Sequence, residues 1–250
     1  MAITEDAPVA APSTRHARAT RADPSGDAAR GPEPGRETYA VTDRTRIRRA
    51  DRASYDRALV HAVLDEALVC HAGFVVDGQP YVIPVLHGRD GETLYVHGLP
   101  ATRLMRELRS GIPVSVEATL LDGLVMARSS FHHSMNYRSV VVLGRARLVR
   151  DRATKLRGLR AIVEHVARGR WNDARQPSEP ELRQTHVLAI PIVEASAKVR
   201  TGPPVDDPAD VDLPVWGGVI PVRECFAEPI PDGNGAPVDL PGYLAGYRRG

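Results

Sequence analysis

The sequence predicts an α+β protein built on an antiparallel β-barrel with a few peripheral helices. Short apolar runs separated by turn signals predict several hairpin-linked strands, and Asp77-Gly78 is the strongest of these signals. The run 140–143 is continuously apolar and branched, as in a strand buried on both faces. The polar cluster just before it, at 127–139, places hydrogen-bonding side chains at the start of that strand. Such a cluster on a rigid sheet is typical of a ligand or cofactor site.

The remaining elements follow from apolar spacing and end signals. The few helices are expected at the periphery of the sheet, and the sequence contains no internal repeat. The expected elements are a helix after Asp51, strands at 67–76, 81–86 and 93–97, a turn at 88–91, a short helix at 100–109, strands at 114–121 and 125–127 around Asp122-Gly123, a strand at 137–149, a helix capped by Asp151, a short helix capped by Ser178, and a strand at 187–192.

Composition divides the chain into three parts. Residues 1–40 contain hardly any large apolar side chain, so we expect a disordered N-terminal tail. Order is expected from about Arg46, and one domain covers 46–222. Proline and glycine dominate 223–250, which we expect to be a C-terminal tail.

Totals limit the class of protein. The formal net charge of +2 and the dispersed Lys and Arg residues argue against a nucleic-acid partner. No apolar run approaches membrane-spanning length, and residues 1–10 lack the apolar core of a signal peptide. Cys70 and Cys225 are too few and too far apart for a disulfide framework or a metal-binding pair. We therefore expect a soluble, cytoplasmic protein without a membrane partner.

Five blocks of the chain together resemble the flavin-nucleotide-binding, pyridoxamine-5′-phosphate-oxidase-like family, and within it the branch of the 5-nitroimidazole-resistance proteins. They occur in order between residues 46 and 222. The blocks are Tyr81-Val-Ile-Pro84, Leu94-Tyr-Val-His97-Gly98, Ala127-Arg-Ser-Ser-Phe-His-His-Ser-Met-Asn-Tyr-Arg-Ser-Val-Val-Val-Leu-Gly-Arg-Ala146, Ala195-Ser-Ala-Lys-Val-Arg-Thr-Gly-Pro-Pro204, and Pro214-Val-Trp-Gly-Gly-Val219.

The resemblance implies an FMN-binding split β-barrel of antiparallel, Greek-key-like strands that forms a homodimer with FMN at the subunit interface. It also implies an FMN-dependent oxidoreductase, in which hydride passes through the flavin N5 to or from a small substrate. The Arg-x-His segment of true pyridoxamine-phosphate oxidases has no counterpart here, because 216–221 reads Trp-Gly-Gly-Val-Ile-Pro. Vitamin B6 synthesis is therefore disfavoured, and nitro-group reduction is the nearer analogy.

Two groups of cofactor-binding residues follow from the resemblance. The backbone of the first strand block would meet the polar edge of the flavin ring, and hydroxyl and guanidinium groups near a short helix would hold the phosphate. This first group consists of Tyr81, Val82, Ile83, Pro84, His97, Gly98, Thr102 and Arg103. Without the resemblance, Arg103 and its neighbour Arg106 would be read as a solvated helix face, and Thr102 as a helix cap alone.

The second group would line the flavin groove, some members from the partner subunit. It consists of His133, Ser134, Asn136, Tyr137, Arg138, Lys198 and Trp216. Ser134 and Asn136 would otherwise only satisfy the backbone of a bulge, Lys198 would be solvent-exposed, and Trp216 would belong to the core. The adjacent His132 and His133 point in opposite directions on an extended segment and lack companion ligands, so no metal site is expected.

Two further classes of function stay open. The first is a non-catalytic flavin- or haem-binding module on the same fold, with His71, His87 or His133 as an axial ligand. The second is a cofactor-free interaction protein. No protein nucleophile is required by the flavin chemistry, and none is indicated, since no Gly-x-Ser-x-Gly turn surrounds Ser129-Ser130.

Overall fold

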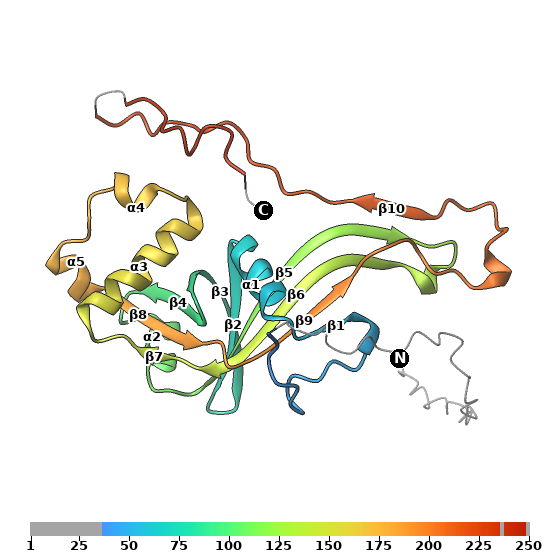
Figure 1. The fold of residues 1–250 in the computed structure, drawn as a ribbon, viewed down its shortest axis with the longest axis horizontal. Helices are drawn as coiled ribbons and strands as arrows, with labels where there is room; N and C mark the ends of the chain where they lie inside the picture. Colours follow the sequence, from blue (N-terminus) through green and yellow to red (C-terminus); the bar gives the residue numbers. More distant parts are fainter. Residues whose placement is uncertain (1–36, 236–237, 249–250) are drawn as a thin grey trace, which may run out of the picture. The chain divides into compact units, whose positions relative to one another are not determined.

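An open antiparallel sheet of ten strands forms the centre of the described part of the chain (Figure 1). The computed structural model describes residues 37–235 and 238–248. The strand order is β1-β9-β6-β5-β2-β3-β4-β8-β7, with β10 added to β5, so the two end strands do not close a barrel. The strands are β1 Ala53–Ser54, β2 Val69–Val76, β3 Gln79–Asp90, β4 Thr93–Gly98, β5 Pro113–Met126, β6 Ser134–Arg145, β7 Arg147–Leu148, β8 His186–Pro191, β9 Glu194–Arg200 and β10 Gly218–Pro221. The predicted α+β class and antiparallel sheet are confirmed.

The hairpin of β2 and β3 turns where the sequence predicts. Asp77 and Gly78 have φ values of 50° and 79°, the positive pair that a tight two-residue hairpin turn requires. Strand β3 continues to Asp90. Of the range 88–91, where a turn was expected, only Gly91 lies in the turn. Along β2 the buried side chains alternate with exposed ones, which gives the sheet one core face and one outer face.

The expectation of two strands around a turn at Asp122-Gly123 is wrong. Strand β5 passes through both residues, and its register against β6 shifts between Leu121 and Gly123 as a β-bulge. The dipeptide serves long-range packing here. A Cβ at Gly123 would lie 2.9 Å from Cγ1 of Val219 in β10, so that strand approaches closely enough to require glycine.

Helices cap the sheet as the end signals indicate, with one shift. Helix α1 (Arg57–Glu66) begins after Asp56 rather than after Asp51, because Ala53 and Ser54 first pair with β9. Asp151 caps α3 (Arg152–Val166), and Ser178 with Glu181 forms the predicted capping box of α5 (Glu179–Gln184). The short helices α2 (Arg103–Leu108) and α4 (Arg170–Asp173) and the 3₁₀ turns η1 (Ala50–Arg52), η2 (Ser130–His132) and η3 (Pro208–Asp210) complete the fold.

Apolar packing joins the helices to the sheet on two sides. Val60, Val63 and Leu64 of α1 are fully buried in the main core. Helix α3 packs on a separate cluster that contains Tyr95 and Val187. No helix in the described residues is long and apolar enough to span a membrane.

The described chain ends both pack against the domain. Tyr39 is 3% exposed, and Thr38 forms a β-bridge with Asp56, so ordered packing begins before the expected start at Arg46. Most of the expected N-terminal tail, 1–36, lies outside the described residues. After β10 the C-terminal segment has no helix or strand within its described residues, yet the Tyr243 hydroxyl donates to Asp173 of α4 at 2.6 Å.

Candidate functional site

The backbone of β3 is open on one side at the predicted flavin-binding block. Tyr81 to Pro84 pair with Phe74 to His71 of β2 along one edge. On the other edge β4 pairs with β3 only from His87 to Asp90. Every second residue of the block therefore turns its backbone C=O, and its N–H except at Pro84, away from the sheet, without a strand partner in the described part of the chain. Such an edge can bond to the polar rim of a flat ring.

Arg103 lies beside this open edge. Its guanidinium carbon is 4.4 Å from the centroid of the Tyr81 ring, which itself stacks on Phe74 at 5.8 Å. Arg103 is exposed and forms no ion pair among the described residues. Its neighbour Arg106 differs, because Nη2 of Arg106 is 2.8 Å from Glu107. Arg103 is thus a cation held by an aromatic face and available to an anionic ligand.

The other members of the first group lie on β4 and at the start of α2. The Thr102 hydroxyl donates to the Leu99 carbonyl at 2.9 Å and caps no helix amide. A Cβ at Gly98 would meet Met105 Cγ at 3.2 Å, so the strand end fits closely over α2. Burial lowers the pKa of His97, which favours its neutral imidazole form.

The second predicted group gathers on β6 and β9. Arg200, only 8% exposed, donates to the Asn136 side-chain carbonyl, and Asn136 donates to the Gly202 carbonyl at 3.1 Å. Asn136 is thereby bonded to the backbone of the segment that follows β9. The Lys198 ammonium lies 5.9 Å from the centroid of the Tyr137 ring. These residues lie along the long hairpin of β5 and β6, which we call the arm. We call the polar residues on it the strip on β6 and β9.

The remaining members of this group extend the strip to the end of the arm. His132 Nε2 is 3.3 Å from Asp207, whereas His133 Nδ1 is 3.0 Å from the Ser129 carbonyl, so the two rings have different partners. Ser134 begins β6 and is half-buried. Trp216 is 63% exposed and is not part of the core. Within the described chain, no three His, Cys, Asp or Glu side chains group closely enough to hold a metal ion.

Arg138 is engaged in an ion-pair network. Its guanidinium donates to Asp122 at 3.0 and 2.8 Å and to Glu66 at 2.8 Å, with a second, shorter bond to Glu66. Both carboxylates raise the pKa of Arg138 and hold it charged. The network ties the end of α1 to the β5 bulge and lines a cavity of about 480 Å³ beside Phe226. Nearly all of the donors of Arg138 are thereby occupied within the chain.

The two predicted groups occupy different parts of the sheet. Strands β2 and β5 separate β3 from β6, which is three interstrand spacings, or about 14 Å. No contact in the described residues joins Arg103 to the strip on β6 and β9. One chain therefore presents a ring-and-phosphate site and, at a distance, a second set of polar side chains.

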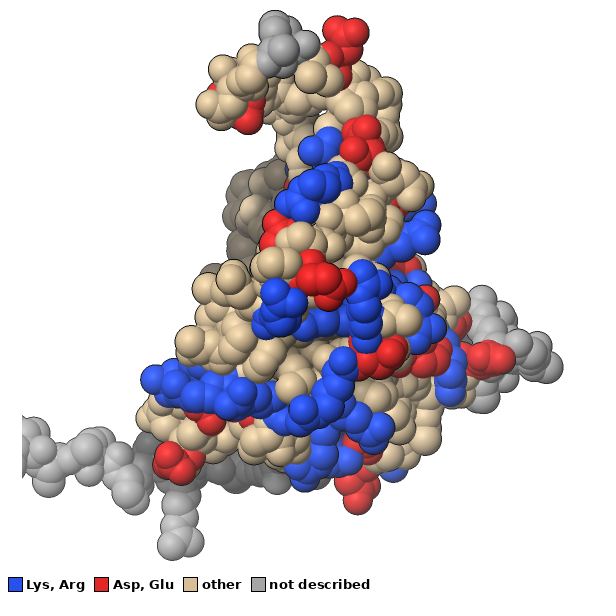
Figure 2. Space-filling model, turned by 90° about the vertical axis from the view of Figure 1, so that its left-hand side faces the viewer, with Lys and Arg blue, Asp and Glu red and all other residues tan. Residues whose placement is uncertain are grey.

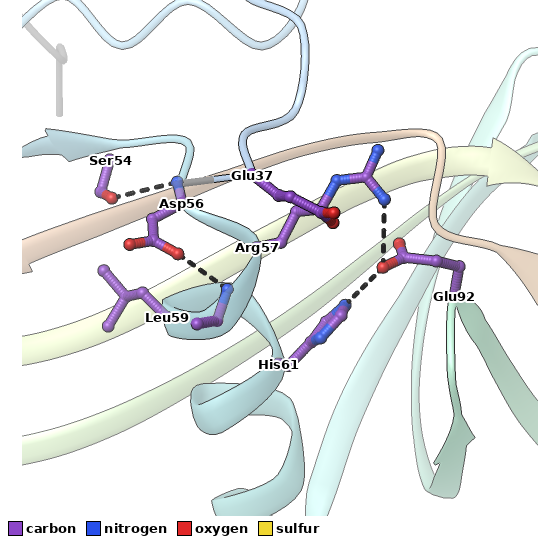
Figure 3. A pocket seen from close by; sticks show the side chains of 8 residues that line it. Glu37, Ser54, Asp56, Arg57, Leu59, His61 and Glu92 are labelled. Carbon is purple, nitrogen blue, oxygen red and sulfur yellow. Dashed lines mark hydrogen bonds and ion pairs between the residues drawn. The ribbon is translucent and has the colours of Figure 1, made fainter. Parts of the chain in front are cut away.

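Sequence reasoning missed a third polar cluster, which lines a cavity of about 640 Å³ at the start of α1 (Figure 3). Glu92 accepts a hydrogen bond from the Tyr39 hydroxyl at 2.7 Å and lies 3.2 Å from Arg57 and 3.1 Å from His61. Burial and the nearby Arg89 lower the pKa of His61, while Glu92 opposes the shift. The spacing of Arg57 and His61 places both on one side of α1, but nothing local in the sequence points to Glu92.

Comparisons with known proteins agree with this architecture. The family profile described as pyridoxamine 5′-phosphate oxidase matches residues 56–199, more than half of the chain. No curated protein sequence matches. The protein therefore belongs to the pyridoxamine 5′-phosphate oxidase family, and its open sheet is the split barrel of that family.

Among solved structures, two resemble nearly the whole chain. The flavocytochrome Anf3 from Azotobacter vinelandii is 40% identical, with a TM-score of 0.79, over 85% of this chain and 100% of its own. The FAD and heme binding protein from Mycobacterium smegmatis is 31% identical, with a TM-score of 0.75, over 79% and 98%. A proposed 5-nitroimidazole antibiotic resistance protein from Bacteroides thetaiotaomicron shares the fold, with 24% identity, a TM-score of 0.51, and coverage of 59% and 86%. The first two are thus more similar to this chain than the third.

Proposed function

We propose that the protein is a flavin-dependent oxidoreductase whose flavin lies against the open edge of β3. The observation that carries the proposal is the juxtaposition of this edge at Tyr81–Pro84 with Arg103, a cation without an ion-pair partner in the described residues. The donor set fits a flavin. Backbone groups suit the polar rim of the ring, and a guanidinium suits its phosphate. Two similar structures are named for flavin or FAD binding.

The roles of the chain's own residues follow from the geometry. Tyr81 positions the Arg103 guanidinium by holding it over its ring, at 4.4 Å. The backbone of Val82 and Ile83 orients the cofactor, and neutral His97 lines the site without adding charge. When bound, a flavin supplies hydride transfer at N5, so the protein needs to bind, orient and shield rather than to provide a nucleophile.

These residues address the FMN portion, which FAD also contains. We therefore keep FMN as the proposed cofactor, because it is the smallest flavin nucleotide that these residues could bind. Identification of the flavin released from purified protein would distinguish FMN from FAD. The homodimer remains a proposal as well. It is supported by the two separated groups of polar residues, since a second copy would bring the strip on β6 and β9 to the ring that the first copy holds.

Absorption spectroscopy of the purified protein tests the oxidoreductase. We expect a flavin spectrum near 1:1 stoichiometry that bleaches under anaerobic reductant and recovers when a small nitroaromatic acceptor is added. A bound flavin that no reductant or acceptor turns over would leave a binding module. A protein that neither contains nor takes up flavin would remove the function.

A second candidate function, haem binding, is favoured by the surroundings of His71. His71 shares the outer face of the sheet with Val69, Val75 and Val82, whose exposed fractions are 47%, 56% and 69%. An apolar surface around one imidazole suits a porphyrin face and its axial ligand. Nδ1 of His71 is 3.5 Å from Glu117, a contact that can orient the ring. The two most similar structures reported above are named as haem proteins.

We propose His71, rather than His87 or His133, as the axial ligand. His87 is fully buried, with Nε2 2.8 Å from the Leu64 carbonyl. We expect a Soret band from protein reconstituted with haemin, and loss of that band in His71→Ala. His133→Ala, on the arm, is the matched control. A Soret band unchanged in His71→Ala would exclude this ligand.

A further inference from the structure

Positive charge is concentrated in one segment of the chain. Residues 145–183 contain eleven Lys and Arg against five Asp and Glu, a net charge of +6, although the whole chain carries +2. This segment includes β7, α3, α4 and α5, and Figure 2 shows Lys and Arg gathered on the side of the molecule where these elements lie in Figure 1. The face therefore has a positive potential that the total charge conceals.

The carboxylates of the segment are all occupied by local partners. Asp151 accepts from the Thr154 amide, and Glu164 accepts from two amides at the start of α4. The other three form ion pairs, Asp173 with Arg170, Glu179 with Arg152 and Glu181 with Arg175. Several exposed arginines have no ion pair within the described residues. We call six of them the basic face: Arg109, Arg147, Arg150, Arg157, Arg160 and Arg168.

Helix α3 turns its arginines to solvent because its other side is packed. A Cβ at Gly158 would lie 2.7 Å from the Tyr95 ring, so this side of α3 lies directly on the sheet. Arg157 and Arg160 lie on the other side of α3 and are exposed, and exposed Arg168 follows two residues after the last residue of the helix. Arg157 and Arg160 are held on a rigid element, since α3 is a helix of fifteen residues.

The basic face borders the candidate flavin site. His186 pairs with Gly98 across β4 and β8. Burial lowers the pKa of His186, and so do the charges of Arg109, Lys155 and Arg150. A positive field therefore reaches the strand next to the flavin-binding group. Arg109 follows the last residue of α2, which Arg103 begins, so the two lie about 9 Å apart along the helix.

We propose that the basic face docks an acidic electron-carrier protein that reduces the flavin. This inference rests on the proposed function, because it names the electron donor of that site. Each carrier molecule is oxidised by one electron, two successive encounters supply the two electrons, and solvent supplies the protons. Guanidinium groups form bidentate pairs with surface carboxylates, and opposite charges accelerate the encounter.

The observations favour an acidic protein over other polyanions. Single-stranded nucleic acid binds where exposed aromatic rings accompany the cations. The exposed Phe131, Trp216 and Phe226 belong to other elements, and Trp171 of α4 is only half-exposed. An anionic membrane surface would favour apolar anchors among the cations, and on α3 only Val166, 37% exposed, qualifies. A donor is also what a flavin oxidoreductase requires.

Stopped-flow reduction of the flavin-loaded protein by a reduced bacterial flavodoxin, used as the acidic probe, tests the proposal. We expect the second-order rate constant of the native chain to fall steeply as the salt concentration rises. In the triple variant Arg150→Gln, Arg157→Gln, Arg160→Gln we expect a loss of about tenfold or more at low salt. Reduction by dithionite, which needs no docking, should be equal in both proteins.

A control variant with the same change in charge is Arg46→Gln, Arg48→Gln, Arg223→Gln, which replaces exposed arginines outside the basic face. It should retain the native rate. Equal reduction rates in the two triple variants would overturn the docking proposal. It would also be overturned if the basic-face variant were reduced at the native rate and lost only the binding of duplex DNA or of anionic vesicles. Absence of flavin from the native protein would instead overturn the proposed function, so the two failures are distinguishable.

Discussion

At the scale of single residues, an arginine can bind a ligand only if its hydrogen-bond donors are not already used within the chain. Arg103 and Arg138 were both predicted to contact flavin. Arg138 donates to Glu66 and Asp122 and has few donors left. Arg103 contacts only an aromatic face among the described residues and keeps its donors for a ligand. The two arginines therefore have different consequences when they are replaced.

Replacing Arg103 should weaken flavin binding without unfolding the protein. We expect Arg103→Ala to raise the dissociation constant for FMN about tenfold to hundredfold, the value of a charge-assisted hydrogen bond. Fluorescence titration of the apoprotein measures it. Arg106→Ala on the same helix should change the constant by less than about twofold. Equal effects of the two replacements would place the phosphate elsewhere.

Replacing Arg138 should cost stability instead. Its side chain is 27% exposed and its two partners 28% and 33%, so the network is partly shielded from solvent. We expect Arg138→Gln to lower the free energy of unfolding by about 1–3 kcal/mol in urea titrations. Arg145→Gln, at the exposed end of the same strand, should cost less than about 0.5 kcal/mol. A neutral Arg138→Gln would contradict a structural role.

At the scale of elements, glycines allow α3 to lie directly on the sheet. A Cβ at Gly88 of β3 would be 2.4 Å from the Ala161 carbonyl carbon and 2.5 Å from the Ile162 amide. These are backbone atoms of α3, so a side chain cannot be accommodated by a rotamer change. The contact fixes the helix that carries Arg157 and Arg160, two of the six residues of the basic face.

Gly88→Ala should separate helix and strand. We expect a loss of about 1–3 kcal/mol in unfolding free energy, measured by thermal and urea denaturation. Gly242→Ala is the control, because nothing lies within 4 Å of its Cβ position. A Gly88→Ala protein as stable as the control would show that α3 does not pack as described.

At the scale of the whole molecule, the histidines make stability depend on pH. Burial lowers the pKa of His61, His97 and His186 in the folded protein. The unfolded chain consequently binds more protons as the pH falls through about 6.5, the ordinary pKa of histidine. Their contribution to stability is present above that pH and is lost below it. Lowered carboxyl pKa values, such as that of Glu181 at about 2, act in the same direction in more acidic solution.

Unfolding free energy should therefore decrease between pH 7.5 and 5.5. Urea titrations at several pH values measure the slope, and His186→Gln should make it shallower. A stability that is constant or that rises over this interval would mean that the histidines are not protonated more readily on unfolding.

The contrast between predicted and missed features also belongs to the whole molecule. Local signals were sufficient for the Asp77-Gly78 turn and the Ser178 capping box, because neighbours in the sequence make those interactions. Asp122-Gly123 has the same signal as Asp77-Gly78 but became a bulge, since β10, far along the chain, packs against it. Glu92 and its partners Tyr39 and His61 come from three separate segments, so no local pattern could identify that cluster.

The central claim is that flavin lies on the open edge of β3 beside Arg103. Hydrogen–deuterium exchange of the apoprotein with and without FMN tests it most directly. The unpaired amides among residues 81–83 should exchange quickly until the ring binds them, whereas Pro84 has no amide hydrogen. We predict that FMN slows exchange in this block and around Thr102 and Arg103. Protection confined to the cavity at the start of α1, or no protection anywhere, would contradict the account.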